Sequence, residues 1–229
     1  MGVIFPIILG LLPSFGWLVF YLQEDLRHPE PKKLIFYTFI AGALSTVFVL
    51  QIQLVIDNWS RDYFESFSFP SLFILAVIEE VFKFGAAYFM VGHRKELDEP
   101  VDAMIYMVVA ALGFSAVENV ASVFQSPNGL AAGVGPVEII TLRFVGATLL
   151  HTLVSALVGY YWGRALVKKS GLVGLIVFGL TLATLLHAIF NYFIINLETI
   201  AIPTIFLIFV AFFVLNDFEK LKKIRTPLS

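Results

Sequence analysis

The sequence predicts an all-α protein: a polytopic transmembrane helix bundle of about seven spans, with the N-terminus outside and the C-terminus in the cytoplasm. Three observations support this prediction. Hydrophobic residues make up 59% of the 229 residues and charged residues 14%, against roughly 25% charged in ordinary globular chains, and the mean hydropathy is +0.89. Apolar stretches of the length that crosses a bilayer, about 20 residues, recur along the chain. Basic residues gather on alternate connections between these stretches.

The expected spans follow from the apolar stretches, taken in chain order. They cover residues 2–22, 33–56, 71–92, 101–124, 138–164, 171–196 and 198–215. The first stretch lacks a basic segment before it and a small-residue cleavage site after it, so it is expected to be a retained helix rather than a signal peptide. The connections are short and contain no low-complexity linker. Residues 1–229 are therefore expected to form a single transmembrane domain.

The distribution of Lys and Arg predicts the orientation of these spans. Twelve of the fifteen basic residues lie in or beside the connections 23–32, 93–100 and 164–170 and in the C-terminal tail. The opposite set of connections, together with the N-terminus, holds only Arg61. Because cytoplasmic loops carry the excess of basic residues, the sequence predicts a multi-pass protein of the cell membrane, embedded in the lipid bilayer, with a cytoplasmic C-terminus.

Composition also excludes several classes of function. The chain has no cysteine, which excludes disulfides, cysteine-ligated zinc, iron–sulfur clusters and a cysteine nucleophile. Its formal net charge is −2, and no basic domain is present, so no nucleic-acid partner is expected.

Ionisable side chains inside the expected spans carry the functional information. A charged side chain at the bilayer centre costs ~2.5–3.5 kcal/mol on insertion scales, so each one indicates a buried pair, a wet cavity or a functional site. Seven such residues need an explanation here: Glu79, Glu80, Lys83, Glu118, Arg143, His151 and His187.

Their spacing and depth indicate that they meet. On a helix, Lys83 lies within reach of both Glu79 and Glu80, which leaves one carboxylate without a cation. Measured along the helices at 1.5 Å per residue, the Glu and His side chains all fall roughly 9–20 Å below the outer ends of their spans. Four spans are thus expected to bring carboxylates and imidazoles to one layer, as a buried hydrolytic centre requires.

Two neighbouring amides belong to the same pattern. Asn119 follows Glu118, and Asn191 lies four residues after His187, on the same face of its helix. Intramembrane Glu, Lys and His residues also serve proton-coupled transporters and receptors, so this class is the alternative function. A retinal receptor would need a lysine in the last span, and residues 198–215 contain none.

The motifs resemble those of the PrsW family of intramembrane proteases, which are related to the CAAX prenyl endopeptidases and bacterial CPBP proteins. The resemblance rests on Glu79-Glu80-x-x-Lys83, Gly113-Phe114-x-x-x-Glu118-Asn119, His151 with the small residues up to Gly159, and His187-x-x-x-Asn191, in the order of the family. Ala103 stands where the family pattern has glycine, a difference expected to affect packing. The resemblance covers nearly the whole chain.

The resemblance implies an endopeptidase that cleaves a membrane-anchored protein substrate, of the kind that makes the first cut in an anti-sigma factor. It implies these catalytic residues: Glu79, Glu80, His151 and His187. The supporting residues would be Lys83, Glu118, Asn119, Arg143 and Asn191. Imidazole and carboxylate ligands suit zinc, with Glu118, His151 and His187 as the expected ligands. The chain has no His-Glu-x-x-His helix, so a metal-free glutamate mechanism stays open beside the zinc mechanism.

Overall fold

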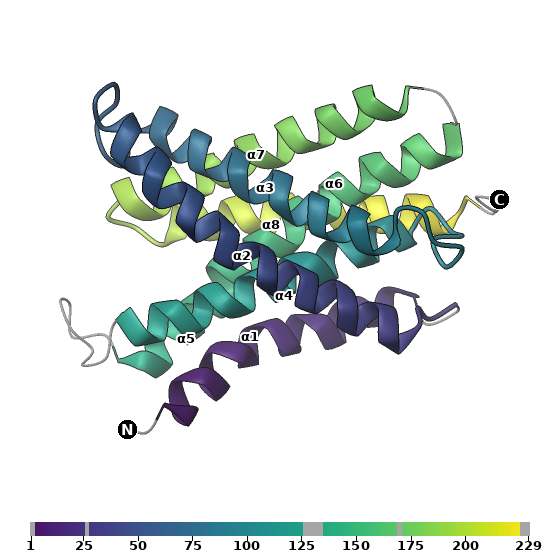
Figure 1. Ribbon diagram of the computed structural model, residues 1–229, viewed down its shortest axis with the longest axis horizontal. Helices are drawn as coiled ribbons and strands as arrows, with labels where there is room; N and C mark the ends of the chain where they lie inside the picture. The colour runs from purple at the N-terminus through teal and green to yellow at the C-terminus, as the bar shows by residue number, and fades with distance from the viewer. Residues whose placement is uncertain (1–2, 26–27, 126–134, 169–170, 225–229) are drawn as a thin grey trace.

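The computed structural model describes residues 3–25, 28–125, 135–168 and 171–224, and within these ranges the regular structure is entirely helical (Figure 1). The helices are α1 (Ile4–Leu22), α2 (Lys32–Ser60), α3 (Phe69–Val91), α4 (Asp102–Gln125), α5 (Pro136–Arg143), α6 (Leu149–Lys168), α7 (Leu172–Asn196) and α8 (Ala201–Lys222). A π-helical turn, Phe144–Thr148, joins α5 to α6. The all-helical prediction is therefore confirmed.

Six helical segments of the described chain are long and apolar enough to cross a membrane: α1, α2, α4, the continuous stretch Pro136–Lys168, α7 and α8. The remaining expected span is α3, which has 23 residues and, at 1.5 Å per residue, is about 34 Å long. Its sequence differs from the other six because Glu79, Glu80 and Lys83 lie in its middle. All three side chains are buried, so α3 turns its charged residues away from the outer surface.

Helix α4 forms the centre of the bundle. Nearly every residue of its first four turns is buried, and α1, α2, α3 and α6 pack around it. Glycines permit this close packing: a Cβ atom on Gly42 of α2 would overlap the backbone of Ala110, and one on Gly113 of α4 would overlap the backbone of Phe39. Gly159 of α6 meets the backbone of α4 in the same way, as expected from its place in the small-residue run.

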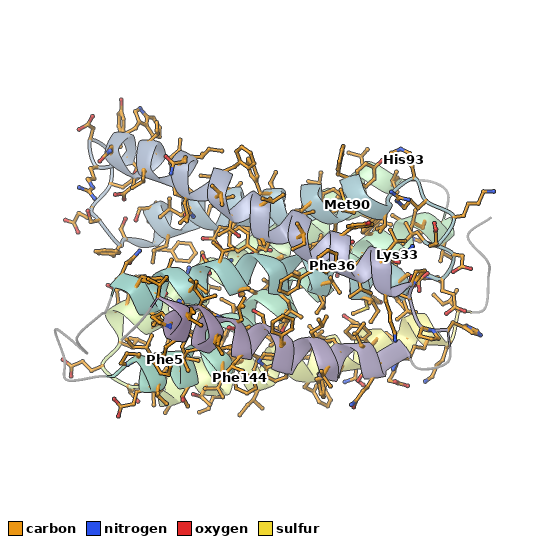
Figure 2. All side chains as sticks on the ribbon, turned by 60° about the horizontal axis from the view of Figure 1, so that its bottom comes forward. Phe5, Lys33, Phe36, Met90, His93 and Phe144 are labelled. Atoms are coloured by element: carbon orange, nitrogen blue, oxygen red, sulfur yellow. The ribbon has the colours of Figure 1, made fainter. Side chains whose placement is uncertain are left out.

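The lateral surface of the bundle is apolar. Large side chains such as Phe36 and Phe89 are 59% and 84% exposed, and Figure 2 shows Phe36 on the side of the bundle. Lys33 and His93 lie at one end, and Phe5 lies toward the other (Figure 2). A bundle with apolar sides and polar ends is the arrangement that a bilayer requires.

The beginning of α1 and the end of α8 lie at opposite ends of the bundle (Figure 1), as an odd number of crossings requires. Arg27, Lys169 and Arg225, which contribute to the charge asymmetry, lie outside the described residues. The direction of insertion stays a prediction.

Candidate active site

Helix α3 supplies two carboxylates and one ammonium group. The helix begins after Ser68, with Pro70 in its first turn, where the missing N–H of proline costs nothing. Nine and ten residues after Pro70 come Glu79 and Glu80, which are 7% and 0% exposed, followed by Lys83, which is 0% exposed. Charged groups so deeply buried need partners, because an isolated ion is costly to remove from water.

Lys83 connects α3 to α6. Its Nζ donates to Glu80 Oε1 at 2.5 Å and to His151 Nδ1 at 3.0 Å, and it lies 5.3 Å from the centre of the Phe114 ring. Since an ammonium group can only donate, His151 Nδ1 accepts and its Nε2 carries the proton. The imidazole of His151 is therefore neutral in this arrangement.

The other nitrogen of His151 is bound by α4. His151 Nε2 donates to Glu118 Oε2 at 2.9 Å, and Arg143 Nη2 donates to the same oxygen at 3.2 Å. Arg143 also donates through Nε to the amide oxygen of Asn119, whose Nδ2 donates to Thr148 Oγ1 at 3.0 Å. Glu118 and Asn119 thus fix the positions of a histidine and an arginine from the neighbouring helix.

The π-helical turn explains how Arg143 and His151 reach one carboxylate. Eight residues at 3.6 per turn leave two side chains about 80° apart around a regular helix. The wider turn at Phe144–Thr148 reduces this offset, because each of its residues rotates the chain by a smaller angle. Such turns inside α-helices are frequent at functional sites.

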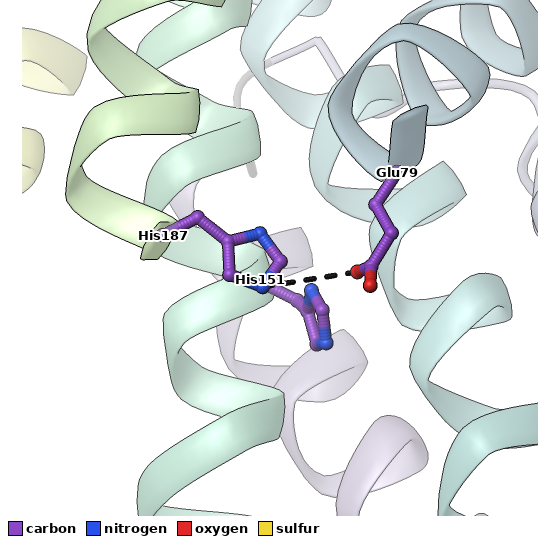
Figure 3. Close-up of side chains that lie close together, drawn as sticks. All are labelled: Glu79, His151 and His187. Atoms are coloured by element: carbon purple, nitrogen blue, oxygen red, sulfur yellow. Dashed lines mark ion pairs between the residues drawn. The ribbon is translucent and has the colours of Figure 1, made fainter. Parts of the chain in front are cut away.

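His187 of α7 completes the layer. Its Nδ1 donates to Glu80 Oε1 at 2.7 Å, which leaves the Nε2 atom directed toward Glu79, with Glu79 Oε2 3.7 Å away (Figure 3). The rings of His151 and His187 are 5.0 Å apart, centre to centre, and nearly perpendicular. Figure 3 shows the Glu79 carboxylate pointing from α3 toward both imidazoles.

Among the described residues, Glu79, His151 and His187 form a group in which one ligand atom from each lies within 4.8 Å of the others. Glu79 Oε2 is buried and has no hydrogen-bond partner in the described structure. One carboxylate oxygen and two imidazole nitrogens are ligand types that zinc prefers, and Nδ1 of His151 would exchange its contact with Lys83 for the metal.

This group differs from the ligands expected from the sequence. Glu118 is already occupied by His151 and Arg143, whereas Glu79 takes the place beside the two histidines. Glu118 holds His151 in the manner of the outer carboxylates that orient metal-binding histidines. The assignment of the ligands themselves stays a prediction.

Gln53 of α2 is a contact that sequence reasoning missed. Its Nε2 donates to Glu79 Oε1 at 2.8 Å, so one oxygen of this carboxylate is held while the other faces the histidines. Gln53 was missed because only ionisable residues were considered within the spans, and an amide is uncharged. A glutamine within an apolar span was the available signal, because polar side chains in membranes usually bond across helices.

Asn191 is less closely tied to the layer than the other predicted residues. It lies one turn beyond His187 on α7 and is half-buried. The structure therefore brings together the residues that are called the Glu/His layer below: Glu79, Glu80, Lys83, Glu118, Asn119, Arg143, His151 and His187. Their catalytic roles stay predictions.

Comparison with known proteins gives a consistent result. Residues 30–216 match the sequence profile of a family described as PrsW family intramembrane metalloprotease. Curated proteins called Protease PrsW are similar to this chain. The one from Oceanobacillus iheyensis is 29% identical over 184 residues, which is 80% of each chain. That from Geobacillus kaustophilus is 28% identical over 156 residues, 68% of this chain and 64% of the relative. No solved structure matches at comparable significance.

Proposed function

The chain belongs to the PrsW family of intramembrane metalloproteases, and from this premise we propose that Glu79, His151 and His187 form its peptidase centre. The protein is a multi-pass intramembrane protease, and the transporter alternative is not favoured. The observation that carries the proposal is the position of one oxygen of Glu79. Glu79 Oε2 is buried, has no hydrogen-bond partner in the described structure, and lies 3.7 Å from His187 Nε2, on the side that faces both imidazoles (Figure 3).

Peptide hydrolysis needs a water molecule that loses a proton and a group that stabilises the oxyanion formed on the carbonyl. In our proposal, the proton of a water beside Glu79 passes to Oε2, and from there to the leaving nitrogen. His187 faces the same space beside His151, and with both ring nitrogens protonated its Nε2 would donate to the developing oxyanion while Nδ1 keeps its bond to Glu80. Burial of the layer strengthens these interactions, because water no longer screens them.

The remaining polar residues hold these three in place. Gln53 fixes Glu79, Glu118 fixes His151, and Glu80 fixes His187. Lys83 balances the charge of Glu80 and binds His151 at once. In this assignment Glu80 is a positioning residue, and Glu79 is the member of the pair that acts on water.

We further propose that the metal of this metalloprotease family is zinc, bound by His187 through Nε2 and by His151 through Nδ1, which would exchange its contact with Lys83 for the metal. When bound, zinc activates water and polarises the scissile carbonyl. Glu79 is the carboxylate that would either complete the ligand set or receive the proton. Replacement of Glu79 by glutamine separates these roles, since the loss of a ligand lowers the metal content and the loss of a base does not.

The substrate class that suits a site within the membrane is a membrane-anchored protein. We propose a single-span regulator, such as an anti-sigma factor, as the physiological substrate. The buried layer requires that the scissile segment enters between the helices.

The proposal is tested with purified protein in proteoliposomes and a membrane-anchored model substrate. Glu79→Gln is expected to lower turnover by at least about 100-fold, the usual scale for losing a general base. Glu65→Gln, in the exposed connection between α2 and α3, is the matched control and should cleave normally. Bound metal is measured on the same samples by mass spectrometry. Normal cleavage by Glu79→Gln would refute the assignment.

A further inference from the structure

A second site lies between α6, α7 and α8. There the structure has a cavity of about 320 Å³, and none of its lining residues belongs to the Glu/His layer. The apolar part of the lining includes Leu182, Leu186, Phe209 and Phe213. Phe209 and Phe213 are 62% and 48% exposed, so this part opens onto the lateral surface that faces lipid.

The arrangement of the three helices produces the cavity. Helix α6 packs against both α7 and α8. Helices α7 and α8 contact each other through Phe206, whose ring lies 6.5 Å from that of Phe190 and 5.8 Å from that of Phe193. These contacts are near the connection between the two helices, and toward the other end of the bundle the helices diverge (Figure 1). Helix α6 forms the base of the space between α7 and α8.

The other end of the cavity is polar and basic. Arg164 and Lys220 both lie over the ring of Tyr160, at 5.6 and 5.8 Å from its centre. Lys220 forms an ion pair with Asp217 at 2.7 Å. Within the described part of the chain, no carboxylate lies within ion-pair distance of Arg164. Two cations and one anion leave a net charge of +1 at this end.

We propose that this cavity binds an anionic glycerophospholipid. The phosphate would lie between Arg164 and Lys220, and an acyl chain would follow the apolar lining toward Leu186. Arg164 lies about one turn before the end of α6, and Lys220 lies in the last turn of α8, so the cations are at the depth of headgroups. A guanidinium group with free donors matches the geometry of a phosphate, and basic pockets between transmembrane helices bind anionic headgroups.

The combination of charge and apolar surface selects this occupant over two others. A free phosphate ion would use the cations but would leave the apolar lining uncovered. A second copy of the chain would cover the lining, but the same face of that copy carries the same net positive charge, which would oppose a symmetric contact. A lipid satisfies both parts with one molecule. This inference is independent of the protease assignment because it uses none of the residues of the peptidase centre.

The experiment is native mass spectrometry of the full-length protein in detergent with added phosphatidylglycerol or phosphatidylcholine of identical acyl chains. The wild type is expected to retain phosphatidylglycerol at least about tenfold better, since each basic residue near the surface contributes measurably to binding an anionic lipid. Arg164→Gln combined with Lys220→Gln should abolish this preference. Lys33→Gln, which removes an exposed cation from α2, is the control and should keep it.

A second variant distinguishes loss of the lipid site from misfolding of the protein. Leu182→Trp leaves the cations in place but fills the apolar part, and it should lower retention of both lipids while the binding of inorganic phosphate stays unchanged. Equal retention of the two lipids by the wild type would overturn the proposal. So would a lipid-independent dimer that Phe213→Ala dissociates, because a second copy would then be the occupant.

Discussion

Replacement of Lys83 by methionine is the sharpest test of how charge is balanced in the Glu/His layer. Lys83 and Glu80 have no exposed side-chain surface, and their ion pair measures 2.5 Å between Nζ and Oε1. Methionine has a similar length and removes only the charge and the donors. The carboxylate of Glu80 would then be buried with the His187 bond as its remaining partner.

The expected loss of stability is about 3–5 kcal/mol, the range for removing one partner of a buried ion pair. The double variant Lys83→Met, Glu80→Gln should recover most of this loss. It removes both charges together, and the amide oxygen of the introduced glutamine can still accept the bond from His187. Arg61→Met is the control. It breaks an exposed pair with Asp57, and such pairs contribute about 0–1 kcal/mol.

The assay is unfolding by SDS in mixed micelles, followed by tryptophan fluorescence from the three tryptophans of the chain. A Lys83→Met variant destabilised by less than about 1 kcal/mol would refute the ion-pair reasoning. A double variant no more stable than the single one would also contradict the predicted contribution of the ion pair.

Two further predictions concern a positioning residue and the topology. Gln53→Leu should lower kcat by about 10–100-fold with KM unchanged, because this is the usual effect of removing an outer partner of a catalytic group. The control Gln51→Leu, on the same helix, should cleave normally. An unaltered kcat in Gln53→Leu would show that Glu79 does not need this contact. Because the chain has no cysteine, a cysteine at Ser66 should react with an impermeant thiol reagent in intact cells and one at Lys95 should not, and the reverse pattern would invert the predicted orientation.

The sequence predicted the helices well because membrane insertion depends mainly on local hydropathy. The third span was expected at 71–92 and is found at Phe69–Val91. The second was expected to end at residue 56, but α2 continues to Ser60. The added turn is polar and ends in an ion pair between Asp57 and Arg61, so hydropathy alone could not include it.

The residues of the candidate site could also be predicted from the sequence, but the contacts between them could not. Depth along each span placed Glu80, His151 and His187 in one layer. Which carboxylate meets which histidine depends on the rotation of each helix, and the π-helical turn before His151 changes that rotation without an evident signal in the sequence. For this reason Glu118 was expected among the metal ligands, while in the structure Glu79 lies beside both histidines.

The central claim is that His151 and His187 act together on the peptide bond. Its most direct test is the double variant His151→Ala, His187→Ala, reconstituted in proteoliposomes with a membrane-anchored substrate and compared with His93→Ala, which alters an exposed histidine. We expect turnover of the double variant to fall by at least about 100-fold, bound metal to be lost, and the His93→Ala protein to cleave normally. Cleavage by the folded double variant at the wild-type rate would contradict the assignment of this layer as the peptidase centre.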